Sequence, residues 1–436
     1  MAEAETTEQG ADGSKLSLTG SVALGTGVMI GAGIFALVGQ VAEIAGELLI
    51  WAFVVAAVVV AFSSYSYIRY SATNPSSGGI AMLLKSAFGP GVVAGSFTLF
   101  MYVTMILAES LLGRTFATYV LRPFGLEGSP FWVPALAVLA IAAGALINLV
   151  GNRWVERTAT AAAVVKILGI AALAVAGLIV AGSVQPAVSA APAEEGWVQS
   201  MGALLAGATL CILAYKGFTT ITNQGADLRE PERNIGRSIM ISIILCAVLY
   251  VLITLAVRAS LSLPEIVQAR DYALAEAAEP LFGPWGVRLT VLVAVVATLS
   301  GLTASLFAVS KLYSMLREMG QVPGLPGRVD HQSLIITASL AILAAAFFDL
   351  SRIAALGAML YVAMDIAVHV GVLRMRQDLA ARAWVPCVAI ALDVAVLVPF
   401  LLFQLARDPL TVAITGAVAA VIFGAQWVTV KRRDAL

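Results

Sequence analysis

The chain has 436 residues, of which 60% are hydrophobic and only 12% are charged. Because soluble globular domains carry about 25% charged residues, this composition excludes an ordinary soluble protein. The 26 Lys and Arg residues balance the 26 Asp and Glu residues, and without a basic stripe nucleic acid is not expected as a partner. The three cysteines lie far apart in apolar stretches and fit neither a disulfide framework nor a metal cluster; they are Cys211, Cys246 and Cys387.

Residues 1–18 form an acidic, polar segment. A secretory signal would instead begin with basic residues before a short apolar run, so we expect a disordered cytoplasmic tail. Apolar runs follow, and about 20 such residues cross a hydrocarbon core of about 30 Å. Twelve runs reach or approach this length: 19–40, 48–69, 92–120, 131–150, 159–182, 199–224, 236–258, 286–312, 333–348, 353–374, 384–405 and 409–430. The connections between them are too short for a soluble domain, so we expect the function to lie inside the membrane.

The distribution of Lys and Arg among the connections predicts the orientation, because cytoplasmic loops retain positive charge. If the N-terminus is cytoplasmic, most of these residues fall in connections on that side. We therefore expect a multi-pass protein of the cell (plasma) membrane with both termini in the cytoplasm. Glu43 and Glu47 then lie at the outer end of the first run as solvated entrance residues.

Two of the apolar runs contain segments that are unfavourable for a helix. The first run has glycines at positions 25, 27, 31 and 33, and the sixth contains Ala214-Tyr215-Lys216-Gly217-Phe218. Interrupted helices at matching positions of two halves indicate the binding site of a transporter. We expect both runs to be broken helices, and the alternative is close helix packing through small residues.

A broken helix exposes free N–H groups at the start of one half and free carbonyls at the end of the other. The N–H groups suit a carboxylate, and the carbonyls suit an ammonium group or a cation. We expect the N–H groups to come from Ala32, Gly33 and Ile34, and the carbonyls from Tyr215 and Lys216. A zwitterionic amino acid matches both sets.

Several short motifs occur in a characteristic order: Gly31-Ala32-Gly33-Ile34-Phe35, Pro75-Ser76-Ser77-Gly78-Gly79, Phe88-Gly89, the sixth-run segment and Glu230-Pro231-Glu232-Arg233-Asn234-Ile235. With these motifs the chain resembles the amino acid-polyamine-organocation (APC) transporter superfamily over nearly all of its length. It looks closest to the archaeal and bacterial proton-coupled amino acid transporters of that superfamily. The further matching stretches are Gly27-Val28-Met29-Ile30-Gly31-Ala32, Tyr65-Ser66-Tyr67, Val164-Val165-Lys166-Ile167-Leu168 and Ile221-Thr222-Asn223.

The resemblance implies an all-α membrane protein with 12 transmembrane helices. Two five-helix repeats of opposite topology, 19–182 and 199–374, would form a LeuT-type core with discontinuous helices 1 and 6, and 384–430 would be peripheral. It also implies that Lys166 occupies the place where sodium-coupled relatives bind a structural sodium ion.

Lys166 is flanked on both sides by apolar residues. A buried amine releases its proton more readily than one in water, and ionisable residues inside a membrane are functional by default. We expect protonated Lys166 to donate to carbonyls near Gly27 and Ile30 and to the hydroxyl of Ser300, and so to couple proton movement to opening and closing. The alternative is a lysine paired only to hold helices together.

Glu109 and Lys216 depart from the family pattern, which is generally apolar at both positions. Because an unpaired buried charge is costly, we expect these two residues to form a pair beside the substrate cavity. In the alternative, Glu109 accepts a cationic substrate side chain and Lys216 turns to the cytoplasmic half. A pair favours neutral substrates, a free Lys216 disfavours cationic ones, and a free Glu109 favours them.

Other polar residues inside the runs carry weaker signals. Asp365 and His369 share one helix face at i, i+4 and are expected to be a structural pair, with a second protonation element as the alternative. Asp393 has no obvious partner and is expected at an oligomer interface or the headgroups. Phe218 is expected to cover the substrate as a gate.

The predicted function is secondary active transport of amino acids by alternating access, as proton symport. A polyamine or other organic-cation transporter and a non-transporting amino acid sensor are the alternatives, whereas no HExxH or GxSxG motif suggests an enzyme. We expect no cofactor, no bound sodium or other metal, and a monomer or weak homodimer in the lipid bilayer. The predicted substrate-binding residues are Gly27, Ile30, Gly31, Ala32, Gly33, Ile34, Glu109, Tyr215, Lys216 and Phe218, and the predicted proton-coupling residues are Lys166 and Ser300.

Overall fold

The computed structural model describes residues 16–75, 78–150, 152–181, 197–223, 225–322 and 331–433. Most of the predicted tail 1–18 lies outside these ranges, as do Ser76 and Ser77 of the second motif. The side chain of Ala32 also lies outside the described part of the chain.

The described residues form α-helices and short 3-10 helices. In chain order these are α2 (Leu18–Ala45), η1 (Gly46–Leu48), α3 (Leu49–Thr73), α4 (Gly79–Phe88), α5 (Val92–Leu121), η2 (Arg122–Phe124), α6 (Trp132–Val150), α7 (Asn152–Ala181), α8 (Trp197–Tyr215), η3 (Lys216–Phe218), α9 (Thr219–Thr222), η4 (Gly225–Asp227), α10 (Pro231–Ser260), α11 (Leu263–Gln268), α12 (Ala273–Glu318), α13 (Gln332–Phe347), α14 (Leu350–Arg374), α15 (Trp384–Arg407) and α16 (Pro409–Arg433). Within the described ranges the β structure is limited to an isolated bridge between Leu16 and Leu228.

Ten helical stretches of the described chain are long and apolar enough to cross a membrane. One of them, Gly33–Thr73, combines the second half of α2 with α3, and the apolar α13 is shorter, with 16 residues. The predicted class of helical membrane protein is confirmed, and the number of twelve spans stays a prediction.

Two of the predicted polar connections contain helices. α4 lies in the connection 70–90, and α11 and the first part of α12 lie in the connection 259–285. α12 is bent at Gly283, where the backbone has φ 60° and ψ −151°. Glycine adopts this conformation without the steric penalty that a Cβ atom would bring.

α2 is a continuous α-helix from Leu18 to Ala45, so the predicted break in the first run is wrong. In a continuous α-helix each interior N–H group donates to the carbonyl four residues earlier. The N–H groups of Ala32, Gly33 and Ile34 are therefore engaged within the helix and are not free for a carboxylate.

The glycines of α2 instead make room for neighbouring elements. A Cβ atom on Gly33 would lie 2.5 Å from the Cβ of Ala214, and one on Gly25 would lie 2.6 Å from Cδ1 of Ile221. Glycine weakens a helix by only about 0.5 to 1 kcal/mol relative to alanine, which close packing offsets. The alternative of packing through small residues is what the structure shows.

The predicted interruption of the sixth run is present. α8 ends at Tyr215, η3 forms a single 3-10 turn over Lys216–Phe218, and α9 continues over Thr219–Thr222. A Cβ atom on Gly217 would lie 2.7 Å from the backbone nitrogen of Met29. Glycine is needed in this turn because α2 lies so close to it.

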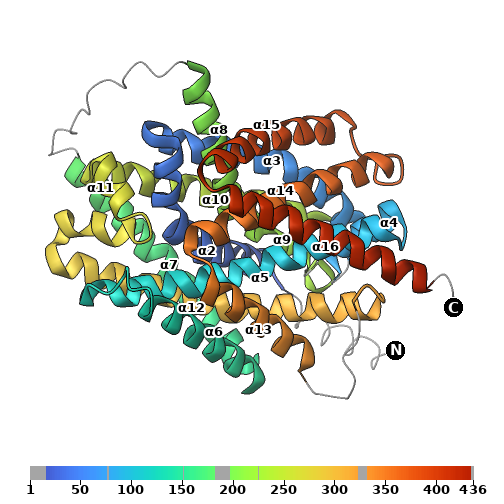
Figure 1. The fold of residues 1–436 in the computed structure, drawn as a ribbon, viewed down its shortest axis with the longest axis horizontal. Coiled ribbons are helices and arrows are strands. Elements are labelled where there is room, and N and C mark those ends of the chain that lie inside the picture. Colours follow the sequence, from blue (N-terminus) through green and yellow to red (C-terminus); the bar gives the residue numbers. More distant parts are fainter. Residues whose placement is uncertain are drawn as a thin grey trace, which may run out of the picture.

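α2 occupies the middle of the helix bundle (Figure 1). α3, α8, α14 and α15 lie above it in this view, and α6, α12 and α13 lie below it. The contacts agree with this arrangement, because α2 touches both α8 and α10 and also α7 and α12, while α5 touches both α12 and α14. The protein core therefore surrounds the helix on which the motifs of the first run lie.

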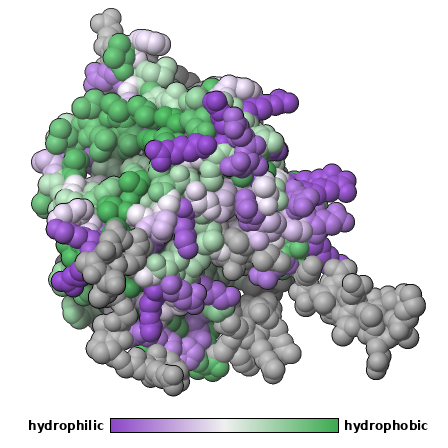
Figure 2. Space-filling view, turned by 90° about the vertical axis from the view of Figure 1, so that its right-hand side faces the viewer, coloured by the Kyte–Doolittle hydropathy of each residue, from purple (hydrophilic) through white to green (hydrophobic). Residues whose placement is uncertain are grey.

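The outer surface of the bundle is apolar. Large side chains such as Leu139, Ile179 and Leu402 are exposed by more than half. Figure 2 shows apolar side chains covering a continuous area of one face, with hydrophilic side chains gathered beside it. Exposed apolar areas of this extent indicate contact with a membrane.

Candidate functional site

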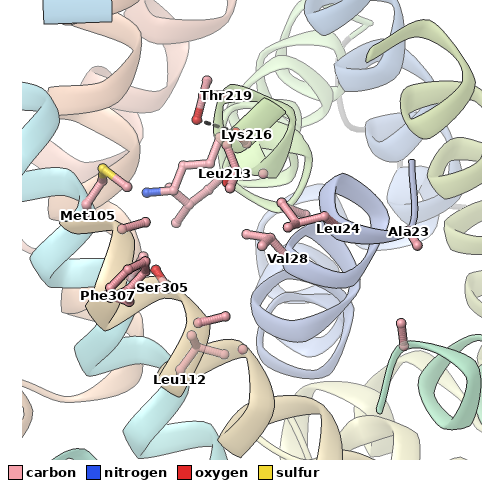
Figure 3. Close-up of a pocket in the computed structure, with 18 of the residues that line it drawn as sticks. Ala23, Leu24, Val28, Met105, Leu112, Leu213, Lys216, Thr219, Ser305 and Phe307 are labelled. Carbon is pink, nitrogen blue, oxygen red and sulfur yellow. Dashed lines mark hydrogen bonds between the residues drawn. The ribbon is translucent and has the colours of Figure 1, made fainter. Parts of the chain in front are cut away.

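A cavity of about 930 Å³ lies between α2, α5, α12 and the interrupted end of α8. Its wall is mainly apolar. The apolar side chains include Leu24, Val28, Met101, Met105, Leu112, Leu213 and Phe307, and Figure 3 shows those of α2 facing those of α5 and α12. Leu16, Ser17 and Gly20 also line the cavity, so it extends to the N-terminal end of α2.

Lys216, the first residue of η3, brings a positive charge into the cavity. Its amine points across the cavity toward α5 and α12 (Figure 3) and donates a hydrogen bond to the carbonyl oxygen of Thr104, 3.2 Å away. The amine also lies 5.9 Å from the ring centre of Tyr361, another wall residue. The 3-10 turn therefore presents a cation among mainly apolar side chains.

Glu109 does not pair directly with Lys216. It is fully buried, it is not among the residues that line the cavity, and neither of its carboxylate oxygens has a hydrogen-bond partner in the described structure. No ion pair joins it to Lys216 among the described residues, so the predicted direct pair is not formed. The reason is helix geometry, because Glu109 lies five residues after Thr104, about 140° around α5.

Lys166 on α7 is 3% exposed, and its amine donates to the carbonyl oxygen of Gly27, 3.1 Å away. The preceding Val165 faces outward and is 42% exposed. The hydroxyl of Ser300 donates within its own helix, to the carbonyl of Val296 at 2.6 Å, so the predicted bond from Lys166 to Ser300 is not formed. Lys166 thus links α7 directly to α2.

Of the predicted site residues whose side chains the structure describes, only Lys216 lines the cavity. Ile30, Ile34, Tyr215 and Phe218 are fully buried in the core. The predicted glycines pack instead against neighbouring helices; a Cβ atom on Gly31 would lie 3.2 Å from the carbonyl oxygen of Ala297, and Gly27 and Gly33 face Ala163 and Ala214. The structure therefore gathers these residues behind the cavity wall, on the other faces of α2 and η3.

Tyr250 of α10 joins the first and sixth runs. Its hydroxyl lies 2.7 Å from the carbonyl oxygen of Met29 on α2 and 3.3 Å from that of Ala214 on α8. Its ring packs against Tyr215, with ring centres 5.0 Å apart. One side chain thus touches the backbones of both helices.

The C-terminal end of α2 is closed by ion pairs. Glu43 pairs with Arg270 at 3.1 Å and also with Arg407, and Glu47 pairs with Arg258. The side chain of Glu43 is only 14% exposed, so its predicted place as a solvated entrance residue is wrong, whereas that of Glu47 is 42% exposed, as such a place requires. The cavity extends to the N-terminal end of α2, and these pairs lie at the opposite end.

Asp271 adds a second contact to this closed end. Its carboxylate accepts a hydrogen bond from Gln40, and the hydroxyl of Ser351 donates to the same Gln40 side chain at 2.6 Å. Burial raises the pKa of the Asp271 carboxyl above its usual range, and the neighbouring Arg270 acts in the opposite direction.

Asp393 is fully buried beside His369, and their nearest side-chain atoms lie 3.3 Å apart. The predicted location at an oligomer interface or the headgroups is therefore wrong. Asp365 lies 3.6 Å from His369 on the same helix. Three ionisable side chains thus meet between α14 and α15, away from the cavity wall.

The sequence matches the amino acid permease family over residues 16–426. The chain belongs to this family. As an amino acid permease it is a multi-pass membrane transporter and not an enzyme, and an amino acid substrate agrees with the cavity found inside the bundle.

Named relatives agree with this assignment. This permease is 31% identical to the inner membrane transport protein YbaT of Escherichia coli over 410 residues, which cover 90% of this chain and 91% of that protein. It is 25% identical to the vacuolar cationic amino acid transporter 4 of Arabidopsis thaliana, over 78% of this chain and 59% of that protein. A crystal structure of a manganese transporter from Eremococcus coleocola has the same fold, with a TM-score of 0.60 and 13% identity over 95% of this chain and 96% of that one.

Among the cavity-wall residues of this permease that the sequence does not single out are Leu24, Ser305 and Tyr361. Leu24 and Val28 are spaced i, i+4 and so share a face of α2, between the glycine positions. Apolar residues at this spacing are as common on a packed helix face as on a cavity wall. Only the position of the neighbouring helices distinguishes the two.

Proposed function

We propose that this permease is a secondary active transporter for neutral, mainly apolar amino acids. The observation that carries this proposal is Lys216, the one lysine or arginine among the described residues of the cavity wall, set among mainly apolar side chains. An ammonium group in such surroundings attracts a carboxylate strongly, because charge-assisted hydrogen bonds gain strength where water is excluded.

In this proposal the substrate carboxylate binds at Lys216 and replaces the bond to the Thr104 carbonyl. The amine of Lys216 thus takes over the role that was predicted for the N–H groups of Ala32, Gly33 and Ile34. The apolar side chains on the facing walls receive the substrate side chain. An aliphatic group gains about 0.8 kcal/mol for each buried CH₂, which favours apolar over small polar substrates.

The same cation disfavours cationic substrates and polyamines. Like charges in a poorly solvated site repel each other. Glu109 interacts electrostatically with Lys216 without a direct ion pair, but it does not line the cavity and so is not placed to bind a cationic substrate. The Arabidopsis relative is named a cationic amino acid transporter; we propose that this chain differs from it in substrate charge.

Transport is proposed to be driven by a proton gradient through Lys166, without a bound sodium ion or another cofactor. Its buried amine and its bond to Gly27 support this proposal. We further propose twelve spans in a 5+5 inverted-repeat core, cytoplasmic termini, the cell membrane as location, and a monomer or weak homodimer. With this orientation, the cavity that opens at the N-terminal end of α2 is an inward-open state, and alternating access requires the ion pairs of Glu43 and Glu47 to open in turn.

Uptake by the purified protein in liposomes tests the proposal. Radiolabelled leucine, alanine, glutamate, lysine and putrescine are offered with and without an inward-directed pH gradient. We expect accumulation of leucine above its external concentration only with the gradient, and little uptake of lysine or putrescine. Binding without uptake would identify a sensor, and preferred uptake of lysine or putrescine would overturn the assigned substrate class.

A further inference from the structure

A cluster of three ionisable side chains lies between α3, α14 and α15, helices that run side by side in the upper part of Figure 1. Nε2 of His369 lies 3.6 Å from Oδ2 of Asp365 and 3.3 Å from Oδ2 of Asp393. All three residues are at most 1% exposed. The cluster is separate from the contact of Lys166 with Gly27.

The two carboxylates have different surroundings. Asp365 accepts hydrogen bonds from Ser63, at 2.6 Å, and from the hydroxyl of Tyr67. Both oxygens of Asp393 lack a hydrogen-bond partner in the described structure, and so does Nε2 of His369. The other ring nitrogen, Nδ1, lies 2.8 Å from the hydroxyl oxygen of Ser66. The polar atoms of the cluster that lack hydrogen-bond partners therefore face one another.

The two carboxylates of the cluster require a compensating positive charge. Two adjacent buried carboxylates cannot both remain ionised without compensation. A proton on each nitrogen of His369 offsets one carboxylate, lets Nδ1–H donate to Ser66 and directs Nε2–H toward Asp365 and Asp393. A second proton on Asp393 makes the cluster neutral and supplies its missing donor.

The cluster lies one layer behind the cavity wall. Tyr361, a wall residue, precedes Asp365 by one turn of α14, and its buried hydroxyl interacts with the hydroxyl of Tyr67. Tyr67, which donates to Asp365, packs edge-on against Phe218 of η3, with ring centres 5.2 Å apart. The cluster is thus in contact with the interrupted turn that carries Lys216.

We propose that Asp365, His369 and Asp393 form a buried proton-binding site that is filled from the cavity through the hydroxyls of Tyr361 and Tyr67. In each transfer a hydroxyl accepts one proton and releases another, so only O–H and N–H bonds change and the cluster gains one proton. The proposed binding of a proton rests on the contacts of the cluster alone. The use of this proton in transport rests on the proposed function.

The helices around the cluster carry other ionisable residues. Those of the described side chains are Glu43 of α2, Tyr65, Tyr67, Arg69 and Tyr70 of α3, Lys85 of α4, Tyr102, Glu109, Arg114 and Tyr119 of α5, Cys211 and Tyr215 of α8, Lys216 of η3, Arg352, Tyr361 and Arg374 of α14, Cys387 and Arg407 of α15, and Lys431 and Arg432 of α16. Among the described residues, no lysine or arginine forms an ion pair with Asp365 or Asp393. The charge on the cluster therefore depends on protons and not on a fixed cation.

Nitrogen-15 NMR of histidine-labelled protein in lipid nanodiscs tests proton binding directly. The chain has two histidines, and His331→Asn removes the other one while suiting the positive φ of 64° at that position. At about pH 8, where an ordinary histidine is neutral, we expect His369 to carry a proton on both nitrogens. In the double variant Asp365→Asn/Asp393→Asn, which removes both carboxylates, we expect the neutral imidazole, and in the matched control Asp378→Asn, which changes an exposed acid, the doubly protonated form.

A neutral His369 in the protein with intact Asp393 would overturn the proposal, and this result needs no further variant to fold. Stoichiometric zinc or manganese in the purified protein would also overturn it, because a metal would then occupy the site of the proton.

The transport arm uses liposomes with the membrane potential held at zero. If Lys166 and the cluster each carry one proton, two protons accompany each leucine, and a pH difference of about 0.5 unit across the membrane balances a tenfold leucine gradient. In Asp393→Asn one proton remains, and the balancing pH difference is about 1 unit. An unchanged balance point in Asp393→Asn would refute the role in transport. Absence of leucine uptake in the unmodified protein would refute the proposed function and leave the NMR result standing.

Discussion

The amine of Lys166 lies 3.1 Å from the carbonyl oxygen of Gly27. This bond joins α7 to the glycine-rich face of α2 although the two residues are far apart in the sequence. The carbonyl of Gly27 already accepts the helical bond from Gly31, so the amine binds its second lone pair. Protonation of the amine strengthens this contact, and loss of the proton weakens it.

Replacement of Lys166 by methionine tests this link, because methionine fills a similar volume without a charge. We expect leucine accumulation at a given pH gradient to fall, because only the proton of the Asp365–His369–Asp393 cluster would still drive it, while exchange of leucine across the membrane persists. Liposome uptake measures both. The control is Lys431→Met at the exposed end of α16, which should behave as the unmodified protein, and full gradient-driven uptake by Lys166→Met would contradict the role of Lys166.

Replacement of Lys216 by methionine tests the carboxylate site. A hydrogen bond to a charged group contributes about 1.5 to 3 kcal/mol, so we expect the Kd for leucine to rise about 10-fold to 150-fold. Scintillation proximity binding in detergent measures this change. Asp227→Asn, which alters the other charged residue of the cavity wall, should change the Kd less than twofold, and an equal effect of both changes would argue for a general effect of cavity charge.

Replacement of Gly33 by alanine tests the packing of α2 on α8. The new Cβ would lie 2.5 Å from the Cβ and 2.7 Å from the Cα of Ala214, and a backbone atom cannot move aside as a side chain does. We expect a loss of about 1 to 3 kcal/mol in stability, seen as a lower apparent Tm in detergent. Gly424→Ala in α16, where a Cβ meets no atom within 4 Å, is the matched control and should keep or raise the Tm.

Asp271 predicts a pH dependence at the closed end of the cavity. Burial raises the pKa of its carboxyl in the folded protein, so the ionised form destabilises the fold, and stability falls as the pH rises through this range. We expect Asp271→Asn, which keeps an oxygen for Gln40, to raise the apparent Tm at about pH 7.5. This gain should shrink toward about pH 4, where both states of aspartate are increasingly protonated; a gain that grows toward acid pH would contradict the assigned direction.

The helical spans could be predicted because each is a continuous apolar run. The Lys166–Gly27 contact was also predictable, since a buried amine needs a carbonyl and the resemblance identifies the neighbouring helix. Whether α2 is broken or continuous could not be predicted, because the same glycines permit either an unwound segment or close packing. The deciding neighbour of Gly33 is Ala214, about 180 residues later. The prediction of a direct bond between Glu109 and Lys216 was wrong for a similar reason. The sequence gives the charge of each residue but not which side of α5 faces η3.

Tyr250 holds the backbones of α2 and α8 through one hydroxyl, close to Met29 and Ala214. Because this contact joins the middle of α2 to the C-terminal end of α8, sliding of one past the other would break it, whereas tilting them together would not. α2 and α8 should therefore tilt together as one rigid unit, with the contact at Tyr250 as the point that moves least. Spin labels at the two ends of α2 would then travel much further than a label beside Met29, and in opposite directions.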